Sequence, residues 1–413
     1  MIRLVEPEDI DAVVRLQASA FNFPVDGSKA DQVRRNIEHD RGEWLVFTLD
    51  GQPVGSLHVR RDQMRMGKSI LLKGDVGDVA VDSSRQGQGL GTHLLQEDHA
   101  WMRDNGFDLA RLGGLFRFYS RFGYVRFFRR YVDFTVGKLA SAGASKVREG
   151  QIPIEEKWAN AIRPFDPELD KREFLNLREE FFKDYLASPV FSDTEVLGPG
   201  PLFWVVRDHG RLLGYLRGSE RETEASEFEA RIQIGEVAFR RECPEVFQAL
   251  IAKAYNDAFE KNIPRMTARL PFDSTLVALL SKMPIRFHFV ETYGGLAGNM
   301  MQIVNLRSLL EKMIPELEDR LRNVFPFSWK GTLEIGIEKD RVGLLIDNGT
   351  IRVQDPSNPE MRISLNEYDL LKLILGLGAF EELQESGSNL KPLPRNLLNA
   401  LFPRRKTYSG LWG

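Results

Sequence analysis

The chain has 413 residues, of which 42% are hydrophobic and 28% are charged, proportions typical of folded globular domains rather than of disordered chains. Its 56 Lys and Arg residues nearly balance its 59 Asp and Glu residues, and the formal net charge is −3. This balance offers no broad basic surface to nucleic acid or to an anionic membrane. The single cysteine, Cys243, excludes an internal disulfide and a cysteine-based zinc site.

The N-terminal residues do not resemble an export signal. Residues 1–9 are acidic where a signal peptide is basic and then apolar, and no apolar run approaches the roughly 20 residues that span a bilayer. The six histidines show no metal-ligand spacing. We therefore expect a cytoplasmic protein of about two to four domains that uses no metal and binds neither nucleic acid nor a membrane.

The first third of the chain predicts alternating strands and helices. Strands are expected at residues 2–4, 44–49, 54–60, 75–81 and 109–112, and helices at 9–20, 89–105 and 118–122. Gly106 is expected to cap the helix 89–105. The alternation is typical of an α/β fold around a mixed sheet.

An internal repeat extends this pattern over the next part of the chain. Residues 77–81 (GDVAV) recur as 235–239 (GEVAF), and residues 110–112 (ARL) recur as 268–270, both 158 residues further on. Two weaker matches, near residues 54 and 125, follow in the same order at almost the same spacing. The first 300 residues therefore predict two copies of one domain.

From about residue 301 the pattern changes. Residues 306–322 predict a helix that Pro315 kinks or divides in two, and 331–354 predict an antiparallel meander followed by an apolar helix at 366–377. The proline-containing tail 390–413 is expected to be mostly extended. We expect domains at 1–150, 151–300 and 301–413, the third with an α+β fold.

A glycine-rich segment, residues 85–92 (RQGQGLGT), joins the strand 75–81 to the helix that follows. Its glycines let backbone N–H groups converge on an anion at a helix N-terminus, and Arg85 adds a positive charge. Such a turn also occurs as a plain connection. Neither a dinucleotide-binding nor a Walker motif fits. Gln86, Gly89 and Gly91 form Gln-x-x-Gly-x-Gly, which resembles the acetyl-CoA pyrophosphate motif of the GNAT acetyltransferases.

The segment 118–124 (FYSRFGY) resembles a second GNAT motif. Two GNAT-like halves followed by a third domain resemble, over essentially the whole chain, the Eis (enhanced intracellular survival) family of N-acetyltransferases. The tail residues 401–403 (LFP) and Tyr408 are similar to the end of that family. The resemblance implies two tandem GNAT (acyl-CoA N-acyltransferase) folds, a C-terminal sterol-carrier-protein-like α+β domain and a homo-oligomer, a hexamer.

The resemblance also implies the chemistry and the residues that carry it. Acetyl-CoA would acetylate a primary amine, namely an aminoglycoside, a polyamine or a lysine side chain. Tyr119 takes the general-acid role, and the C-terminal carboxylate, on Gly413, takes the general-base role, with Asp26, Asp75 and Asp78 as alternative bases. The residues expected to contact acetyl-CoA are Val79, Ala80, Val81, Arg85, Gln86, Gly87, Gln88, Gly89, Leu90, Gly91, Thr92, Gly114 and Leu115.

The second copy lacks these features. At the offset of 158, its loop reads CPEVFQA over residues 243–249, without the three glycines and with an acid that repels phosphate. We expect this half to be catalytically silent, Cys243 to be a buried structural thiol, and His93 and His99 to lie at the surface of the first copy. A non-catalytic protein that senses acyl-CoA, or that carries lipid along the apolar residues 370–377, is the alternative hypothesis.

Overall fold

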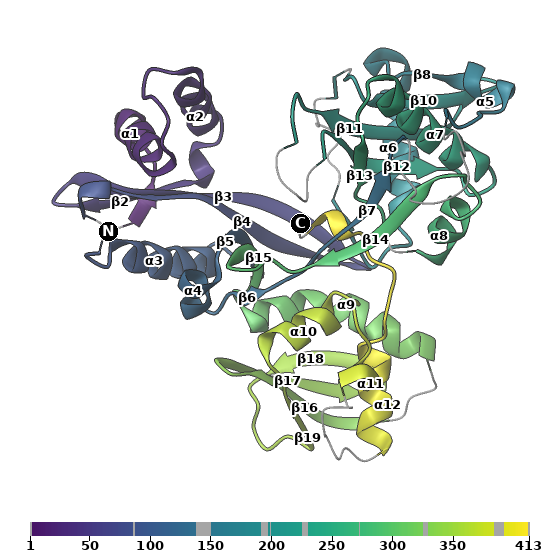
Figure 1. Cartoon of the computed structure of the whole chain (residues 1–413). Helices are drawn as coiled ribbons and strands as arrows, with labels where there is room; N and C mark the ends of the chain where they lie inside the picture. Colours follow the sequence, from purple (N-terminus) through teal and green to yellow (C-terminus); the bar gives the residue numbers. More distant parts are fainter. Residues whose placement is uncertain are drawn as a thin grey trace, which may run out of the picture. The chain divides into compact units, whose positions relative to one another are not determined.

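The computed structural model describes residues 2–85, 87–137, 150–190, 197–198, 200–224, 230–271, 273–324, 329–383 and 392–411 (Figure 1). The chain forms two compact units. The first unit comprises Met1–Phe127, Tyr293–Ile374 and Gly378–Pro403, and the second comprises Phe128–Thr292, Leu375–Leu377 and Arg404–Gly413. None of the helices in the described ranges is long and apolar enough to cross a membrane.

The first unit is built on a mixed sheet with the strand order β1-β2-β3-β4-β5-β15-β6. Only β4 and β5 pair in parallel, and their neighbours are antiparallel. The sheet packs α1 and α2 on one face and α3 on the other (Figure 1). The elements are β1 (Ile2–Leu4), α1 (Ile10–Phe21), α2 (Ser28–His39), β2 (Trp44–Leu49), β3 (Gln52–Met66), β4 (Ser69–Val81), α3 (Leu90–Asp104), β5 (Leu109–Leu115), α4 (Phe116–Tyr119), β6 (Val125–Arg126) and β15 (Ala297–Ile303).

The predicted strands and the helix after the glycine-rich loop are confirmed, and Gly106 ends that helix with a φ of 77°. The strands β3 and β4 are longer than expected because they form a hairpin that reaches Met66 and Ser69. Charged residues along it concealed this extension. Lys73, for example, is buried but forms ion pairs with Asp62 and Asp75 at 3.1 and 3.2 Å.

The second unit repeats this architecture in a sheet with the order β14-β7-β13-β12-β11-β10-β8. In both copies an arginine in the first strand donates two hydrogen bonds to a buried aspartate: Arg3 to Asp9 and Arg163 to Asp170. The elements are β7 (Arg129–Thr135), α5 (Glu156–Ala161), β8 (Ile162–Pro164), α6 (Pro167–Phe182), β9 (Ala187–Pro189), β10 (Phe203–Asp208), β11 (Arg211–Glu220), β12 (Ile232–Phe239), α7 (Glu245–Glu260), β13 (Arg265–Ala268), α8 (Ser274–Leu280) and β14 (Arg286–Thr292).

The two sheets exchange a strand across the domain limits that the sequence suggests. β7 follows the first copy in the chain but lies between β13 and β14 of the second sheet. β15 follows the second copy but lies between β5 and β6 of the first sheet. Each sheet is therefore completed by a segment from outside its own third of the sequence.

The last part of the chain adds a four-stranded sheet, β18-β17-β16-β19, to the first unit. Its helix α9 packs along β4. In the turn between β3 and β4, the backbone N–H of Lys68 donates to Glu316 of α9 at 3.0 Å. The elements are α9 (Leu306–Val324), β16 (Lys330–Ile337), β17 (Asp340–Asp347), β18 (Thr350–Gln354), β19 (Met361–Ser364), α10 (Glu367–Ile374), α11 (Phe380–Leu383) and α12 (Pro392–Leu401).

Two expectations for this part need correction. Pro315 does not divide its segment in two, since α9 is one helix in which Pro315 lies on the exposed side, where the carbonyl that proline leaves unpaired is open to solvent. The tail is not mostly extended, because α12 occupies ten of its residues. Its first proline, Pro392, stands in the first turn, where no N–H is required, and Leu397, Leu398 and Leu401 are buried.

Candidate active site

The parallel strands β4 and β5 diverge at their C-terminal ends. They pair only from Lys73↔Leu109 to Val76↔Leu112, although β4 continues to Val81 and β5 to Leu115. The acetyl-CoA residues expected on strands, 79–81 and 114–115, all lie in these diverging ends. Beyond Val76 and Leu112 the two strands no longer pair with each other.

A bulge in β4 lies at the start of this opening. His58 pairs with Gly77 and Ser56 with Ala80, so that Asp78 and Val79 together face one residue of β3. Asp78 has a φ of 51°, a conformation that non-glycine residues adopt only where the surroundings hold it. Here Gln17 of α1 donates to the carbonyl oxygen of Asp78 at 2.6 Å and to Oγ of Ser56 at 3.0 Å, which fixes the bulge.

The glycine-rich loop requires glycine for its backbone conformation. Gly87 and Gly89 have φ values of 80° and 81°, and a Cβ on either would meet nothing within 4 Å. Gly89 precedes the first residue of α3, where no side chain caps the helix. The first backbone N–H groups of α3 are therefore not occupied by a side-chain cap, as an anion site requires. Arg85 lies 3.8 Å from Asp82 and is partly exposed, and Gln86 lies outside the described residues.

Tyr119 is the last residue of α4, the short helix that directly follows β5. Its ring covers Gly114 so closely that a Cβ there would be 2.2 Å from Cε2 of Tyr119. The ring meets Phe118 and Tyr124 edge-on, with centroids 5.0 and 6.2 Å apart. Burial raises the pKa of Tyr119, so its phenol stays protonated at neutral pH and can donate a proton.

The structure brings most of the expected site residues together in the first unit. Val79, Val81, Phe118 and Tyr119 pack against one apolar cluster, and Gly91 lies 3.4 Å from Phe118 when a Cβ is placed on it. Leu115, at the end of β5, is 61% exposed. Gly413 lies outside the described residues, and the tail before it packs in the second unit, where the hydroxyl of Tyr408 donates to the carbonyl of Gly235 at 2.5 Å.

Of the three alternative bases, Asp78 has the most distinctive surroundings. Asp26 is exposed, and Asp75 forms ion pairs with Arg60 and Lys73 at 2.5 and 3.2 Å. Burial raises the pKa of Asp78, whose Oδ2 lies 4.0 Å from Nδ1 of His58.

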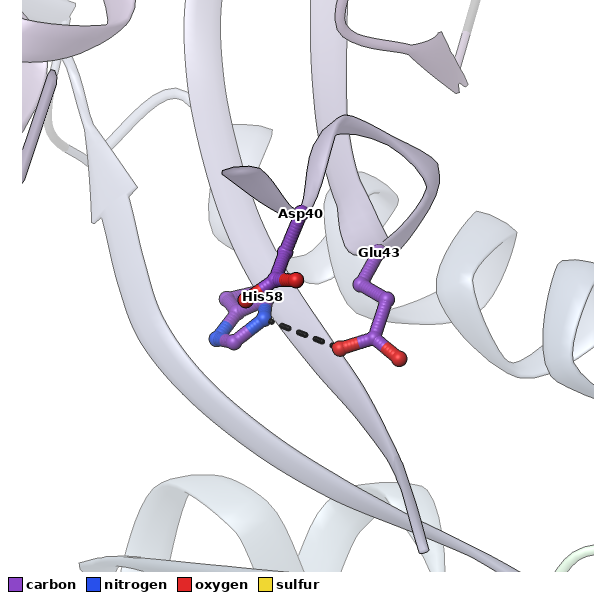
Figure 2. Close-up of side chains that lie close together, drawn as sticks. All are labelled: Asp40, Glu43 and His58. Atoms are coloured by element: carbon purple, nitrogen blue, oxygen red, sulfur yellow. Dashed lines mark ion pairs between the residues drawn. The ribbon is translucent and has the colours of Figure 1, made fainter. Parts of the chain in front are cut away.

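His58 and Glu43 form an ion-pair contact near the bulge of β4 that sequence reasoning missed. Nε2 of His58, on β3, lies 3.4 Å from Oε2 of Glu43, which precedes β2 (Figure 2). The two residues are 15 positions apart in the chain and match no short motif. Only the pairing of Trp44 with His58 across β2 and β3 brings them together, and that register was not visible in the sequence.

His93 is exposed, as expected, whereas His99 is only partly exposed. The His99 ring packs against Tyr124 and Phe122, with centroids 5.4 and 6.4 Å apart, and burial lowers its pKa to about 4. Its neighbour Asp98 is fully buried, and both carboxyl oxygens lack a hydrogen-bond partner among the described residues. Burial raises the pKa of Asp98 to about 8, so both groups are neutral at pH 7.

The second copy has a different connection at the corresponding place. Five residues, 240–244, separate β12 from α7, whereas eight, 82–89, separate β4 from α3. Residues 245–249 are therefore helical rather than part of a loop. On the adjoining strand, Glu236 receives two hydrogen bonds from Arg178, both 2.8 Å long, and one from Tyr215. Cys243 is partly exposed rather than buried.

Comparison with known proteins directly supports the assignment of the first copy as an acetyltransferase domain. Residues 1–127 match the family model of the acetyltransferase (GNAT) domain. The chain has no significant match among curated protein sequences.

Solved structures match over the full length at low identity. A GCN5-related N-acetyltransferase from Kribbella flavida superimposes with a TM-score of 0.65 at 18% identity, covering 99% of this chain and 97% of that one. One from Anabaena variabilis gives 0.62 at 15%, covering 99% and 98%. Eis1 from Mycobacterium abscessus gives 0.60 at 14%, covering 100% of both chains. The chain thus has the GNAT acyltransferase fold, and its residues 1–127 form a GNAT-type acetyltransferase domain.

Proposed function

We propose that this protein is an acetyl-CoA-dependent N-acetyltransferase that moves the acetyl group directly to a primary amine, and that its active site lies in the first copy. One observation carries the proposal: the diverging ends of β4 and β5, the uncapped start of α3 and the Tyr119 ring on Gly114 meet in one region of the first unit. This arrangement suits a thioester with a pyrophosphate-bearing carrier.

The proposed reaction needs few groups. The amine nitrogen attacks the thioester carbonyl carbon, and the oxyanion that forms accepts a hydrogen bond from a backbone N–H of residues 79–81. The carbon–sulfur bond then breaks, and Tyr119 donates to the departing sulfur. Because burial keeps the Tyr119 phenol protonated, the donor is ready at neutral pH.

Turnover is tested by release of free thiol from acetyl-CoA over a panel of an aminoglycoside, a polyamine and a lysine peptide. Tyr119→Phe is expected to lower kcat at least a hundredfold and to leave acetyl-CoA binding nearly unchanged. Tyr368→Phe, on α10, is the matched control and keeps full activity. Binding of CoA without thiol release from any amine would favour the non-catalytic acyl-CoA sensor or lipid carrier instead.

The family resemblance assigns the general-base role to the C-terminal carboxylate of Gly413. Deletion of residues 412–413 decides between this carboxylate and a base within the first unit. A loss of kcat at unchanged acetyl-CoA affinity would support the role, whereas unchanged kinetics would transfer the role to a residue within the first unit.

We further propose that the chain is Eis-like as a whole, hexameric and cytoplasmic, with a sterol-carrier-protein-like third domain that has a structural role. Coverage of the whole chain by Eis1 supports the relationship. The apolar residues of α10 are buried, as in a core: Leu370, Leu371, Leu373 and Ile374. Light scattering coupled to gel filtration tests the hexamer, and extraction of bound lipid tests the structural role.

A further inference from the structure

We infer that His58, oriented by Glu43 and facing Asp78, accepts the proton that the amine must lose before it attacks. The inference rests on the proposed amine acetylation and assigns its general base to the first unit. It makes a residue of β3, rather than the end of the chain, responsible for activating the acceptor.

The position of His58 relates it to the acetyl-CoA strand. His58 pairs with Gly77, the residue before the bulge at Asp78, and the expected acetyl-CoA residues 79–81 follow directly. The preceding residue, Leu57, belongs to the apolar cluster on the α3 face, so the side chain of His58 points to the face that α1 and α2 cover. There its ring stacks on Trp44, with centroids 4.9 Å apart and an interplanar angle of 12°.

Nδ1 of His58 and Oδ2 of Asp78 are separated by a distance that one nitrogen atom can bridge. The 4.0 Å between these two atoms is too long for a direct hydrogen bond. An amine nitrogen placed about 2.9 Å from each atom bridges them with ordinary hydrogen bonds. The Asp78 carboxylate would then hold the ammonium form of the acceptor, and the imidazole would receive its proton.

Nε2 of His58 points in the opposite direction. It is buried, makes no hydrogen bond to the described residues, and lies within ion-pair distance of Oε2 of Glu43, at 3.4 Å (Figure 2). The other oxygen of that carboxylate accepts the backbone N–H of Arg61 at 3.0 Å, which fixes Glu43 in place. A carboxylate at Nε2 favours the tautomer with its proton there and leaves the lone pair on Nδ1, as in other base–orienter pairs.

The remaining charged groups around His58 are Asp40 and Lys29. Asp40 follows α2 and lies near Glu43 (Figure 2), and Lys29 on α2 acts on the Asp78 carboxyl. Three carboxylates and one ammonium thus surround the imidazole. This local excess of negative charge attracts a protonated amine.

The step balances as follows. The ammonium R–NH3+ gives one proton to Nδ1 of His58, and its freed lone pair forms the carbon–nitrogen bond. The carbon–sulfur bond breaks and its electron pair leaves with sulfur, which takes a proton from Tyr119. The nitrogen loses a second proton, which replaces the one that Tyr119 gave. The net proton leaves from His58 to water.

The test compares the wild type with His58→Gln on two acceptors. With an amine that is mainly protonated at the assay pH, the variant is expected to lose about 10²–10⁴-fold in kcat/KM, and its pH profile is expected to follow the ionisation of the amine alone. With hydroxylamine, which is already neutral, the loss is expected to stay below about tenfold. The KM for acetyl-CoA should not change.

Two further variants sharpen the test. Glu43→Gln is expected to lower kcat/KM about tenfold with the protonated amine and to leave turnover of hydroxylamine nearly unchanged, and His93→Gln, an exposed histidine on α3, is the silent control. Equal losses with both acceptors, or an unchanged wild-type profile in His58→Gln, would overturn the inference while the acetyltransferase proposal stands.

A metal ion at His58 is the competing outcome. Asp40, Glu43 and His58 place one donor atom each within 4.8 Å of one another. Wild-type activity that chelation abolishes and Zn²⁺ restores would assign the cluster to a metal and refute the proton-acceptor role. Wild-type inactivity toward every amine would instead refute the proposed function itself.

Discussion

The helices α3 and α7 follow corresponding strands in the two copies and share a buried stripe. α3 buries residues 90, 94, 95, 98 and 102, and α7 buries residues 246, 250, 251, 254 and 258 with the same spacing, together with 247, 249, 252 and 255. Their entrances differ. Eight residues with two left-handed glycines lead into α3, whereas five residues that include Pro244 lead into α7. The second copy thus retains the buried stripe of this helix but lacks the glycine-rich connection that precedes it in the first copy.

The strands that precede these helices, β4 and β12, also differ in how the protein binds their acidic side chains. In the first copy, the neutral Gln17 holds the bulge and leaves the side chain of Asp78 half exposed. In the second, Arg178 and Tyr215 bind the buried Glu236 completely. A side chain with open hydrogen-bonding capacity is available to a substrate, and one that the protein saturates is a structural element. Fold and site therefore depend on separable sets of residues.

The largest predicted effect concerns this structural ion pair. Arg178→Met leaves the Glu236 carboxylate buried and unpaired, and we expect it to lower the free energy of unfolding by about 3–5 kcal/mol. Gln17→Met in the first copy removes only neutral hydrogen bonds and should cost about 1–2 kcal/mol. Urea titrations measure both. If Arg178→Met/Glu236→Gln is as unstable as the single variant, the ion pair is not the cause.

The next prediction concerns the Tyr119 ring. Gly114→Ala places a Cβ 2.2 Å from that ring, which must move, and we expect kcat to fall at least a hundredfold, about 2.7 kcal/mol. Gly113→Ala is the control, because a Cβ at Gly113 meets nothing within 4 Å. Steady-state kinetics of both variants measure this difference in kcat. Equal activities would separate Tyr119 from the chemistry.

The buried acid of α3 predicts a dependence of stability on pH. Asp98 stands where α7 has Ala254. The unfolded carboxyl ionises near pH 3.9 and the folded one at about 8, so wild-type stability falls as pH rises between these values. His99, with its folded pKa of about 4, opposes this trend only below about pH 6.5.

Between pH 6.5 and 8, the wild type should therefore lose about 2 kcal/mol that Asp98→Ala does not lose, at about 1.36 kcal/mol per pH unit. The cavity that alanine leaves costs the same at both pH values and cancels in the comparison. Denaturation midpoints at the two pH values measure the difference. Parallel curves for both proteins would contradict a raised pKa at Asp98.

The smallest predicted effect concerns the loop before α3. Gly89→Ala forces a side chain into a φ of 81°, at a cost of about 1–2 kcal/mol, and should raise the KM for acetyl-CoA about tenfold. Gly51→Ala, in the β2–β3 turn, imposes the same strain at a φ of 76° away from the site. The control should lose stability and keep its KM. A raised KM in both variants would mean that the loop has no special role.

Local patterns explain what was predictable. The strands of the first sheet, the helix α3 and the glycine-rich loop each have a signature within a few residues of chain. Tyr119 was identified because it lies within a motif, and its contact with Gly114 follows from their closeness in the chain.

Features that depend on distant pairing were not predictable. The α2 helix is largely polar, with only Ala30 and Ile37 buried. His58 and Glu43 meet through strand register, and His99 is only partly exposed because its helix turns that face toward Tyr124. The strand exchange could not be predicted either, because the sequences of β7 and β15 do not indicate which sheet each strand joins.

That exchange has a consequence for synthesis. The first sheet cannot be closed until residues 297–303 have been made, because β15 lies between β5 and β6. At about 5–20 residues per second, the ribosome needs roughly 10–35 s to travel from the end of β6 to β15. Throughout that time the outer edge of β5 is an open strand in a nascent chain. A fragment that ends near residue 127 would carry the whole acetyltransferase motif and yet remain in this unfinished, association-prone state.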